Sequence, residues 1–227
     1  MVIWLVLALI AAALQAIAVQ KNSRRLEFFA KPAVIACLWI WLYTSTGLQG
    51  NSFWFGLGLV FSLVGDVVLI SPSDRMFVLG LITFLFTHIF YILGFKEELL
   101  RLTAWSLVLV FFIYINGLRL VRRIVGAMRA QKLNALINPV ILYSLVISLM
   151  LFAALSTMFD PAWKTNAAVF ASVGAFLFYL SDLILAWNKF VTPVKNGRIL
   201  NIIAYYLGQI GLIAGVISHF LSTHLHQ

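Results

Sequence analysis

Two aspartates, Asp66 and Asp182, lie inside segments of the chain that are otherwise almost entirely apolar. An ionised carboxylate in the middle of a membrane span costs on the order of 3 kcal/mol, and such residues usually face the interior of a helix bundle. Two carboxyl groups held close together at low dielectric constant cannot both ionise cheaply, so we expect this pair to share one proton near neutral pH. A protonated carboxyl beside an ionised one suits general acid catalysis, which requires no metal ion or other cofactor.

The elements that carry these acids are membrane spans. The chain has 227 residues, of which 63% are hydrophobic and only 10% are charged, far outside the range of a soluble domain. A helix crosses a bilayer with roughly 20 mostly apolar residues. The sequence therefore predicts an all-α membrane protein, a single domain over residues 1–227 with eight transmembrane helices. The predicted spans are 2–19, 32–48, 52–70, 76–94, 104–121, 136–157, 163–187 and 200–221.

Basic residues are concentrated on one side of the predicted bundle. If the N-terminus lies outside, the cytoplasmic loops 20–31, 71–75, 119–135 and 188–199 hold thirteen of the sixteen Lys and Arg residues. The positive-inside rule therefore predicts an N-out/C-out topology. This distribution also explains the net charge of +9, so we expect no nucleic acid as a partner. The five remaining acids fall in predicted loops where water solvates them: Glu27, Asp74, Glu97, Glu98 and Asp160.

The surroundings of the two intramembrane acids resemble each other. Each acid lies about one turn above the cytoplasmic end of its span, in GDVVL at 65–69 and SDLIL at 181–185. Two further pairs of segments resemble each other: KPAVIACL (31–38) with NPVILYSL (138–145), and FLFTHIFYILG (84–94) with YYLGQIGLIAG (205–215). The three pairs occur in the same order in the first and second halves of the chain. They predict a four-plus-four tandem repeat that brings the two acids face to face across a pseudo-twofold axis. The alternative is chance similarity among apolar helices.

Further polar residues gather in the cytoplasmic half of the predicted bundle. Asn201, Tyr205 and Gln209 follow one another at intervals of four, so they share one helix face. Asn138 and Tyr143 lie in the cytoplasmic half of the sixth span, whereas His88 lies in the outer half of the fourth, deeper than the acids. We infer a polar cavity in the inner half, reachable from the cytoplasmic leaflet. The single cysteine, Cys37, excludes an intramolecular disulfide and a cysteine metal cluster.

These segments resemble the YhhN/lysoplasmalogenase family of eight-span membrane hydrolases. The resemblance rests on LVGDVVLI, FVLGLITFLFTHIFYILGF, GAFLFYLSDLILAWNKF and YYLGQ, which occur in the expected order along most of the chain. It implies cleavage of the vinyl ether bond of a lysoplasmalogen, with release of a fatty aldehyde and glycerophosphoethanolamine or glycerophosphocholine. It also implies that Asp66 and Asp182 are the two motif acids. Other positions of the family pattern are occupied by Lys31, His88, Tyr143, Ser181, Asn188, Tyr205 and Gln209.

The paired acids suit this chemistry. A vinyl ether is hydrolysed when its β-carbon is protonated, and water then captures the resulting oxocarbenium ion, as in glycoside hydrolysis. We favour Asp182 as the acid and Asp66 as the carboxylate that stabilises the cation. Water or the glycerol oxygens would be held by Ser181, Asn201, Tyr205 and Gln209, and the lipid phosphate by Lys31, Arg75 and Lys189.

The same residues leave alternatives open. The basic trio also fits ordinary positive-inside anchoring, and His88, Tyr143 and Tyr205 also fit hydrogen-bonded core positions. Buried acids with internal repeats also occur in proton-coupled transporters, and a helix-borne acid pair occurs in intramembrane aspartyl proteases. A non-catalytic scaffold would leave the acids without a task. We expect a multi-pass protein of a bacterial inner membrane that takes a lysophospholipid from the bilayer. Its oligomeric state and any protein partner stay open.

Overall fold

A computed structural model describes residues 2–71, 73–96 and 103–224, with the backbone alone at 224. Glu97 and Glu98 lie outside the described residues. Within those ranges the chain is all-helical. Its eight α-helices are α1 (Val2–Gln20), α2 (Arg24–Thr46), α3 (Ser52–Val68), α4 (Asp74–Gly94), α6 (Ala104–Ala130), α7 (Ile137–Ser156), α8 (Thr165–Phe190) and α9 (Gly197–His224). Short 3₁₀ turns, η1 (Asn134–Leu136) and η2 (Thr157–Phe159), flank α7.

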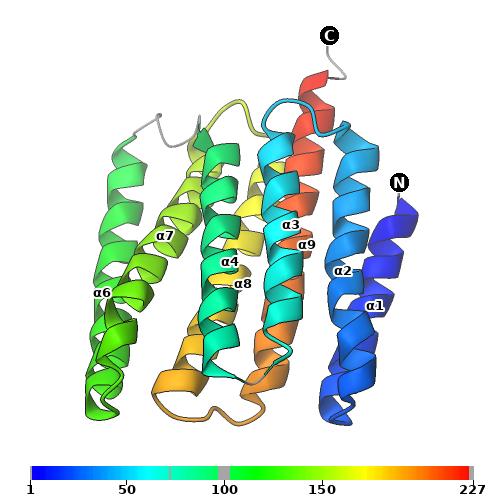
Figure 1. Cartoon of the computed structure of the whole chain (residues 1–227). Coiled ribbons are helices and arrows are strands. Elements are labelled where there is room, and N and C mark those ends of the chain that lie inside the picture. The colour runs from blue at the N-terminus through cyan, green and yellow to red at the C-terminus, as the bar shows by residue number, and fades with distance from the viewer. Residues whose placement is uncertain (1, 72, 97–102, 225–227) are drawn as a thin grey trace.

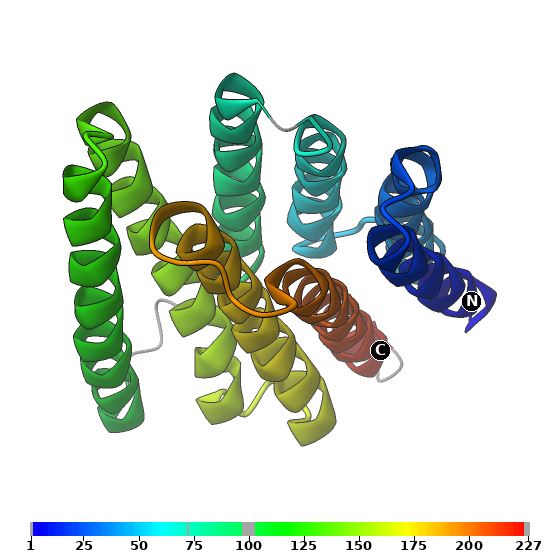
Figure 2. The same cartoon turned by 90° about the horizontal axis from the view of Figure 1, so that it is seen from below.

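The helices form one upright bundle, and the start of α1 and the end of α9 lie toward the same end of it (Figure 1). Seen along the bundle, α3 and α4 lie on one side and α8 and α9 on the other (Figure 2). At the two remaining sides lie the pair α1 and α2 and the pair α6 and α7 (Figure 2). The most extensive helix packing is between α8 and α9, followed by that between α3 and α4.

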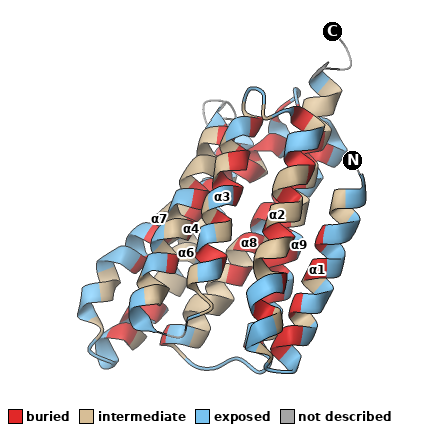
Figure 3. Ribbon diagram, turned by 45° about the vertical axis from the view of Figure 1, so that its right-hand side comes forward, coloured by how far each residue is buried: buried red, intermediate tan, exposed pale blue. Residues whose placement is uncertain are grey.

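The outer surface of this bundle is suited to lipid. Seven helices in the described part of the chain are long and apolar enough to cross a membrane, and α3 is an eighth apolar helix of 17 residues. Large apolar side chains such as Phe111, Phe112 and Leu145 are exposed, while buried residues line the inner faces (Figure 3). The chain is therefore an integral, multi-pass membrane protein.

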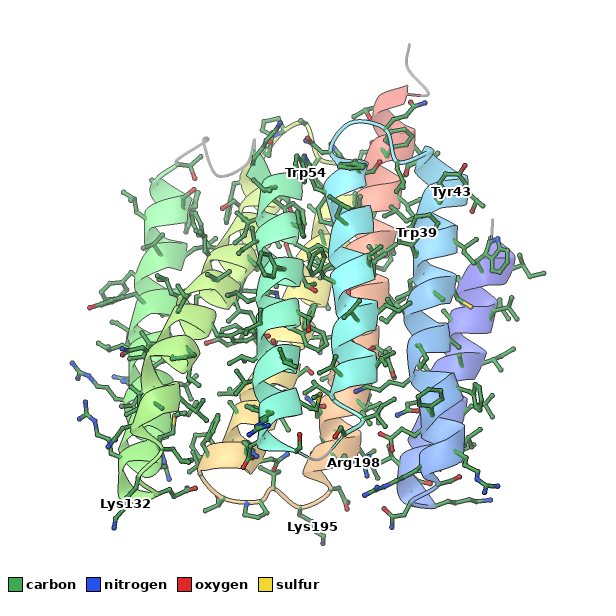
Figure 4. All side chains as sticks on the ribbon, in the orientation of Figure 1. Trp39, Tyr43, Trp54, Lys132, Lys195 and Arg198 are labelled. Carbon is green, nitrogen blue, oxygen red and sulfur yellow. The ribbon has the colours of Figure 1, made fainter. Side chains whose placement is uncertain are left out.

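The two ends of the bundle differ in side-chain type. Lys132, Lys195 and Arg198 lie at one end, and Trp54 and Tyr43 lie toward the other (Figure 4). We call the first the basic end. Its assignment to the cytoplasm, and with it the N-out/C-out topology, stays a prediction, as does the tandem repeat.

Two helices, α2 and α6, extend by two turns or more beyond their predicted spans at the basic end, and α8 and α9 extend by three residues each. Helix α2 begins at Arg24 rather than near residue 32, so Glu27 and Lys31 are helical and not in a loop. Helix α6 continues to Ala130, through most of the loop predicted at 119–135. The reason is that Ile124 and Met128, one turn apart, are buried in a small apolar cluster with Val140 and Phe190. Packing against α7 and α8 thus continues the helix past the apolar stretch.

Small residues set the close contact between α8 and α9. A Cβ atom added to Gly208 would lie 2.7 Å from the backbone nitrogen of Phe178, and one added to Gly215 would lie 2.6 Å from that of Ala171. Only glycine permits the backbones to approach this closely. The contact fixes the register of the helices that carry Asp182 and Tyr205.

Candidate active site

A polar cavity of about 220 Å³ lies inside the basic end of the bundle. Asp66 of α3 and Asp182 of α8 both line this cavity, which we call the polar cavity. Among the lining residues, Ser71 and Ser73 of the α3–α4 loop and Arg198 of α9 are exposed, so they mark the mouth of the cavity. The other polar lining residues are Glu27, Lys31, Ser181, Lys189, Asn201 and Tyr205. Four helices, α2, α3, α8 and α9, and the loop between α3 and α4 therefore contribute polar groups to one space.

Asp66 is almost fully buried, with 1% of its surface exposed, and it has a cation beside it. The Lys31 ammonium lies 3.5 Å from Asp66 Oδ1, and the Tyr205 hydroxyl donates a hydrogen bond of 3.0 Å to Oδ2. An opposite charge and a hydrogen-bond donor both favour the ionised form of a carboxyl group. They offset part of the cost of removing that charge from water.

A row of buried, hydrogen-bonded polar side chains supports Tyr205. Gln209 donates from Nε2 to Ser62 Oγ at 2.7 Å, and its Oε1 accepts a hydrogen bond of 2.6 Å from Tyr91. The Tyr205 hydroxyl is also 3.4 Å from Ser62 Oγ. Gln209 does not line the polar cavity, so it supports the site rather than facing it. Ser62 and Tyr91 are absent from the sequence-based site, although Ser62 lies one turn before Asp66 and faces the same way.

Asp182 has a different set of partners. Its Oδ2 accepts a hydrogen bond from Tyr143 and lies 3.1 Å from His88 Nε2, which is also 3.0 Å from the Tyr143 hydroxyl. His88 is fully buried, and its Nδ1 has no partner among the described residues. A proton on Nδ1 would be buried without an acceptor, so we assign the ring proton to Nε2, where it points at Asp182.

His88 contacts Asp182, although the sequence predicts that His88 lies deeper in the membrane than the two acids. Helical side chains lean toward the N-terminus of their own helix, and α4 and α8 run in opposite directions. His88 therefore leans toward the basic end, whereas Asp182 leans away from it. The two side chains meet although their backbone positions differ in depth.

Asp182 also lines a second, smaller cavity of about 70 Å³ between α4, α6, α7 and α8. We call it the apolar cavity because Leu, Ile, Val and Phe side chains make up most of its wall. Tyr143 lines this cavity and not the polar one. Asp182 is therefore the acid that reaches both spaces.

Two ion pairs lie at the mouth of the polar cavity. Arg198 Nη2 contacts both carboxylate oxygens of Glu27, at 2.7 and 2.6 Å, and Lys189 Nζ lies 2.6 Å from Asp74 Oδ1. Glu27 is only 6% exposed, so the prediction that water solvates it in a loop is wrong. The longer α2 turns it inward, where the guanidinium replaces water. Asp160, also expected in a solvated loop, is 7% exposed and accepts from the Ala162 backbone N–H at 2.9 Å.

The remaining predicted site residues divide into two groups. Asn201 and Ser181 line the polar cavity, and the Asn201 amide donates to Ser181 Oγ at 2.9 Å and to its carbonyl oxygen at 2.7 Å. Asn188 lies elsewhere, because its Oδ1 accepts from the Val194 backbone N–H at 2.7 Å and closes the α8–α9 loop. Asn138 is exposed in the first turn of α7 and lines neither cavity. Within the described ranges, no group of three His, Cys, Asp or Glu side chains is placed to hold a metal ion.

Comparison with known proteins relates most of the chain to one family. The model of the YhhN family matches residues 26–216. The human protein named lysoplasmalogenase TMEM86A is 32% identical over 188 residues, which cover 77% of this chain and 71% of the human protein. Mouse lysoplasmalogenase TMEM86B is 30% identical over 198 residues, covering 84% of this chain and 75% of the mouse protein. No solved structure matches the chain.

Proposed function

Because the chain belongs to the YhhN family, we propose that it is a lysoplasmalogenase. In this proposal it hydrolyses the vinyl ether bond of a lysoplasmalogen, giving a fatty aldehyde and glycerophosphoethanolamine or glycerophosphocholine. The observation that carries the proposal is the polar cavity, in which two intramembrane aspartates face one space with different partners. The related proteins that carry the name lysoplasmalogenase support the reaction class.

We assign the role of general acid to Asp182. Lys31 favours the ionised form of Asp66, which leaves the shared proton on Asp182. Asp182 Oδ2 is engaged by Tyr143 and His88, so the proton is carried by Oδ1. When this proton passes to the β-carbon of the vinyl ether, the two donors stabilise the carboxylate that remains.

Asp66 acts on the cation that this step produces. Its carboxylate stabilises the oxocarbenium ion and takes a proton from the water that attacks it, which gives a hemiacetal. The hemiacetal collapses when Asp66 returns that proton to the glycerol oxygen and the hemiacetal hydroxyl gives its proton to Asp182. The products are the aldehyde and the glycerol alcohol, one water is consumed, and both acids regain their starting protonation states.

The proposal also places the reaction in the membrane. The mouth of the polar cavity lies at the basic end, which the positive-inside rule assigns to the cytoplasm. We propose that the lysolipid enters from the cytoplasmic leaflet, in which its head group already lies near this mouth. A bacterial inner membrane is the proposed location.

The test is turnover by the purified protein in detergent, without any ion gradient. We expect aldehyde release from lysoplasmenylethanolamine and none from its saturated alkyl ether analogue, since a saturated ether has no β-carbon to protonate. The double variant Asp66→Asn/Asp182→Asn is the control for contaminating hydrolases. If wild-type protein releases no aldehyde but moves a solute across liposomes, the transporter alternative replaces the hydrolase.

A further inference from the structure

The apolar cavity lies against the reacting position and has no assigned role. Besides α4 and α8, its wall includes α6, with Gly117, Val121 and Ile124, and α7, with Val140 and Ile147. Among the described residues that form this wall, Asp182 is the only charged one. The polar cavity, in contrast, contains Glu27, Lys31, Lys189 and Arg198 in addition to the two aspartates.

The two cavities meet at Asp182. Phe77, Phe84 and Leu185 line both spaces, so they form the partition around this carboxyl group. A ligand that spans the partition would have its charged part on one side of Asp182 and its apolar part on the other. A lysophospholipid has this division of polarity, with the ether bond between its two parts.

Helix α6 separates the apolar cavity from lipid only in part. It packs on α7 and less extensively on α8, and large apolar side chains on its outer face are exposed, among them Phe111 and Phe112. At Gly117 the wall has no side chain, and a Cβ atom there would lie 3.8 Å from Ser148 Oγ, which is ordinary contact distance. The side of the cavity toward α6 therefore borders the region that the bilayer occupies.

We propose that the apolar cavity seats the first carbons of the alkenyl chain of the substrate, while the rest of the chain passes beside α6 into the bilayer. This inference rests on the proposed function. At about 70 Å³ the cavity is about half the size of one that holds benzene, which gives room for roughly three carbons. The β-carbon of the vinyl ether is on the chain side of the ether oxygen. Seating the chain here brings that carbon to Asp182.

The cavity positions the alkenyl chain more than it attracts hydrocarbon. Lipid tails are as apolar as the wall of the cavity, so transfer of the chain from the bilayer alone gains little. What the chain gains is a fixed orientation of the double bond relative to the acid. A side chain that fills the cavity would overlap the first carbons of a seated lysolipid, so it should weaken lysolipid binding and leave the binding of the head group alone unchanged.

Glycine positions on α6 provide a matched test. Gly117→Leu places a side chain in the wall of the apolar cavity, whereas Gly126→Leu places the same side chain where nothing lies within 4 Å. Gly117→Ala is the intermediate step, because a methyl group fits at that position. Val121→Phe fills the same wall and replaces Gly117→Leu if that variant does not fold.

The readout is binding of two uncleavable ligands to detergent-purified protein by calorimetry, alongside turnover. For Gly117→Leu we expect at least about tenfold weaker binding of the saturated alkyl ether lysophospholipid, with unchanged binding of glycerophosphoethanolamine. For Gly126→Leu we expect both affinities within about twofold of wild type. Equal binding of the lysolipid to Gly117→Leu and wild type would overturn the inference, and so would equal losses for both ligands. Selective loss of lysolipid binding in a protein without turnover would support the chain site and refute the hydrolase.

Discussion

The two acids lie in similar sequence surroundings, GDVVL and SDLIL, yet they have different neighbours. Asp66 of α3 forms an ion pair with Lys31 of α2 and accepts a hydrogen bond from Tyr205 of α9. Asp182 of α8 accepts from Tyr143 of α7 and His88 of α4. In each case one partner belongs to the preceding helix and the other to the last helix of the opposite half. A pseudo-twofold relation between the halves would produce this exchange, which supports the predicted repeat without establishing it.

The difference between the two sites concerns charge. The partner from the preceding helix is an ammonium group at Asp66 and a phenol at Asp182. Asp66 is also the more enclosed side chain, since 2% of it is exposed compared with 11% for Asp182. Asp66 thus has a counter-ion, whereas Asp182 is a carboxyl group that reaches both cavities. The proposed mechanism uses this difference to give the two acids unlike roles in one proton transfer.

The largest expected effect comes from neutralising each acid in turn. Asp182→Asn and Asp66→Asn should each lower kcat by about 10³-fold or more, because each removes an acid or base from the reaction. The two variants should differ in stability. Asp66→Asn leaves the Lys31 ammonium without its carboxylate and should lower the melting temperature, whereas Asp182→Asn should leave it nearly unchanged.

Aldehyde release and the melting temperature in detergent measure these two outcomes. Substantial activity in either variant would refute the acid pair. Equal melting temperatures would refute the difference in charge between the two sites.

The next effect tests whether Lys31 causes that difference. Lys31→Met removes the cation and makes the Asp66 site resemble the Asp182 site, so we expect kcat to fall by about ten- to a hundredfold. Lys31→Arg should retain much of the activity, because the positive charge is kept. Lys132→Met, at the basic end in Figure 4 but outside both cavities, is the matched control. A Lys31→Met enzyme with wild-type kcat would show that Asp66 needs no counter-ion.

The phenol groups sharpen the comparison further. Tyr143→Phe removes a donor to Asp182 and Tyr205→Phe removes one to Asp66. Hydrogen bonds to charged groups contribute about 1.5–3 kcal/mol, so Tyr143→Phe should lower kcat about tenfold or more. Tyr205→Phe should cost less, because Lys31 still faces Asp66. Steady-state kinetics on both variants measures the ratio, and a larger loss for Tyr205→Phe would reverse the assignment of the acid.

Much of this arrangement could be predicted from the sequence. An aspartate inside an apolar span is a strong signal because its burial needs a compensating partner, and both such residues line the polar cavity. Asn201 and Tyr205, spaced by four on one helix, share a face and reach the same cavity. Helix positions follow from runs of apolar residues, which explains why the spans lie within a few residues of most of the observed helices.

What could not be predicted depends on contacts between distant segments. Glu27 pairs with Arg198, 171 positions later, and no local pattern separates such a residue from one solvated in a loop. Asn188 is a different case, because the sequence does contain the signal: it follows Asp182 by six residues, and at about 100° per residue the helical period alone places it on a different face of α8. The approach of His88 to Asp182 depends on the opposite lean of side chains on antiparallel helices.

The smallest effects are expected at the mouth of the polar cavity, where two ion pairs differ in burial. Arg198→Ala removes the partner of the buried Glu27 and leaves a negative charge where a lipid phosphate would pass. We therefore expect KM to rise several-fold with little change in kcat, since no group at the reacting bond is altered. Asp74→Asn is the matched control, because Asp74 is 85% exposed and its pair with Lys189 is screened by water. Kinetics at low and high salt separates the two, because surface charge is screened by salt. A KM that falls for Asp74→Asn by as much as it rises for Arg198→Ala, with both changes lost at high salt, would mean that general surface charge, and not the buried pair, attracts the head group.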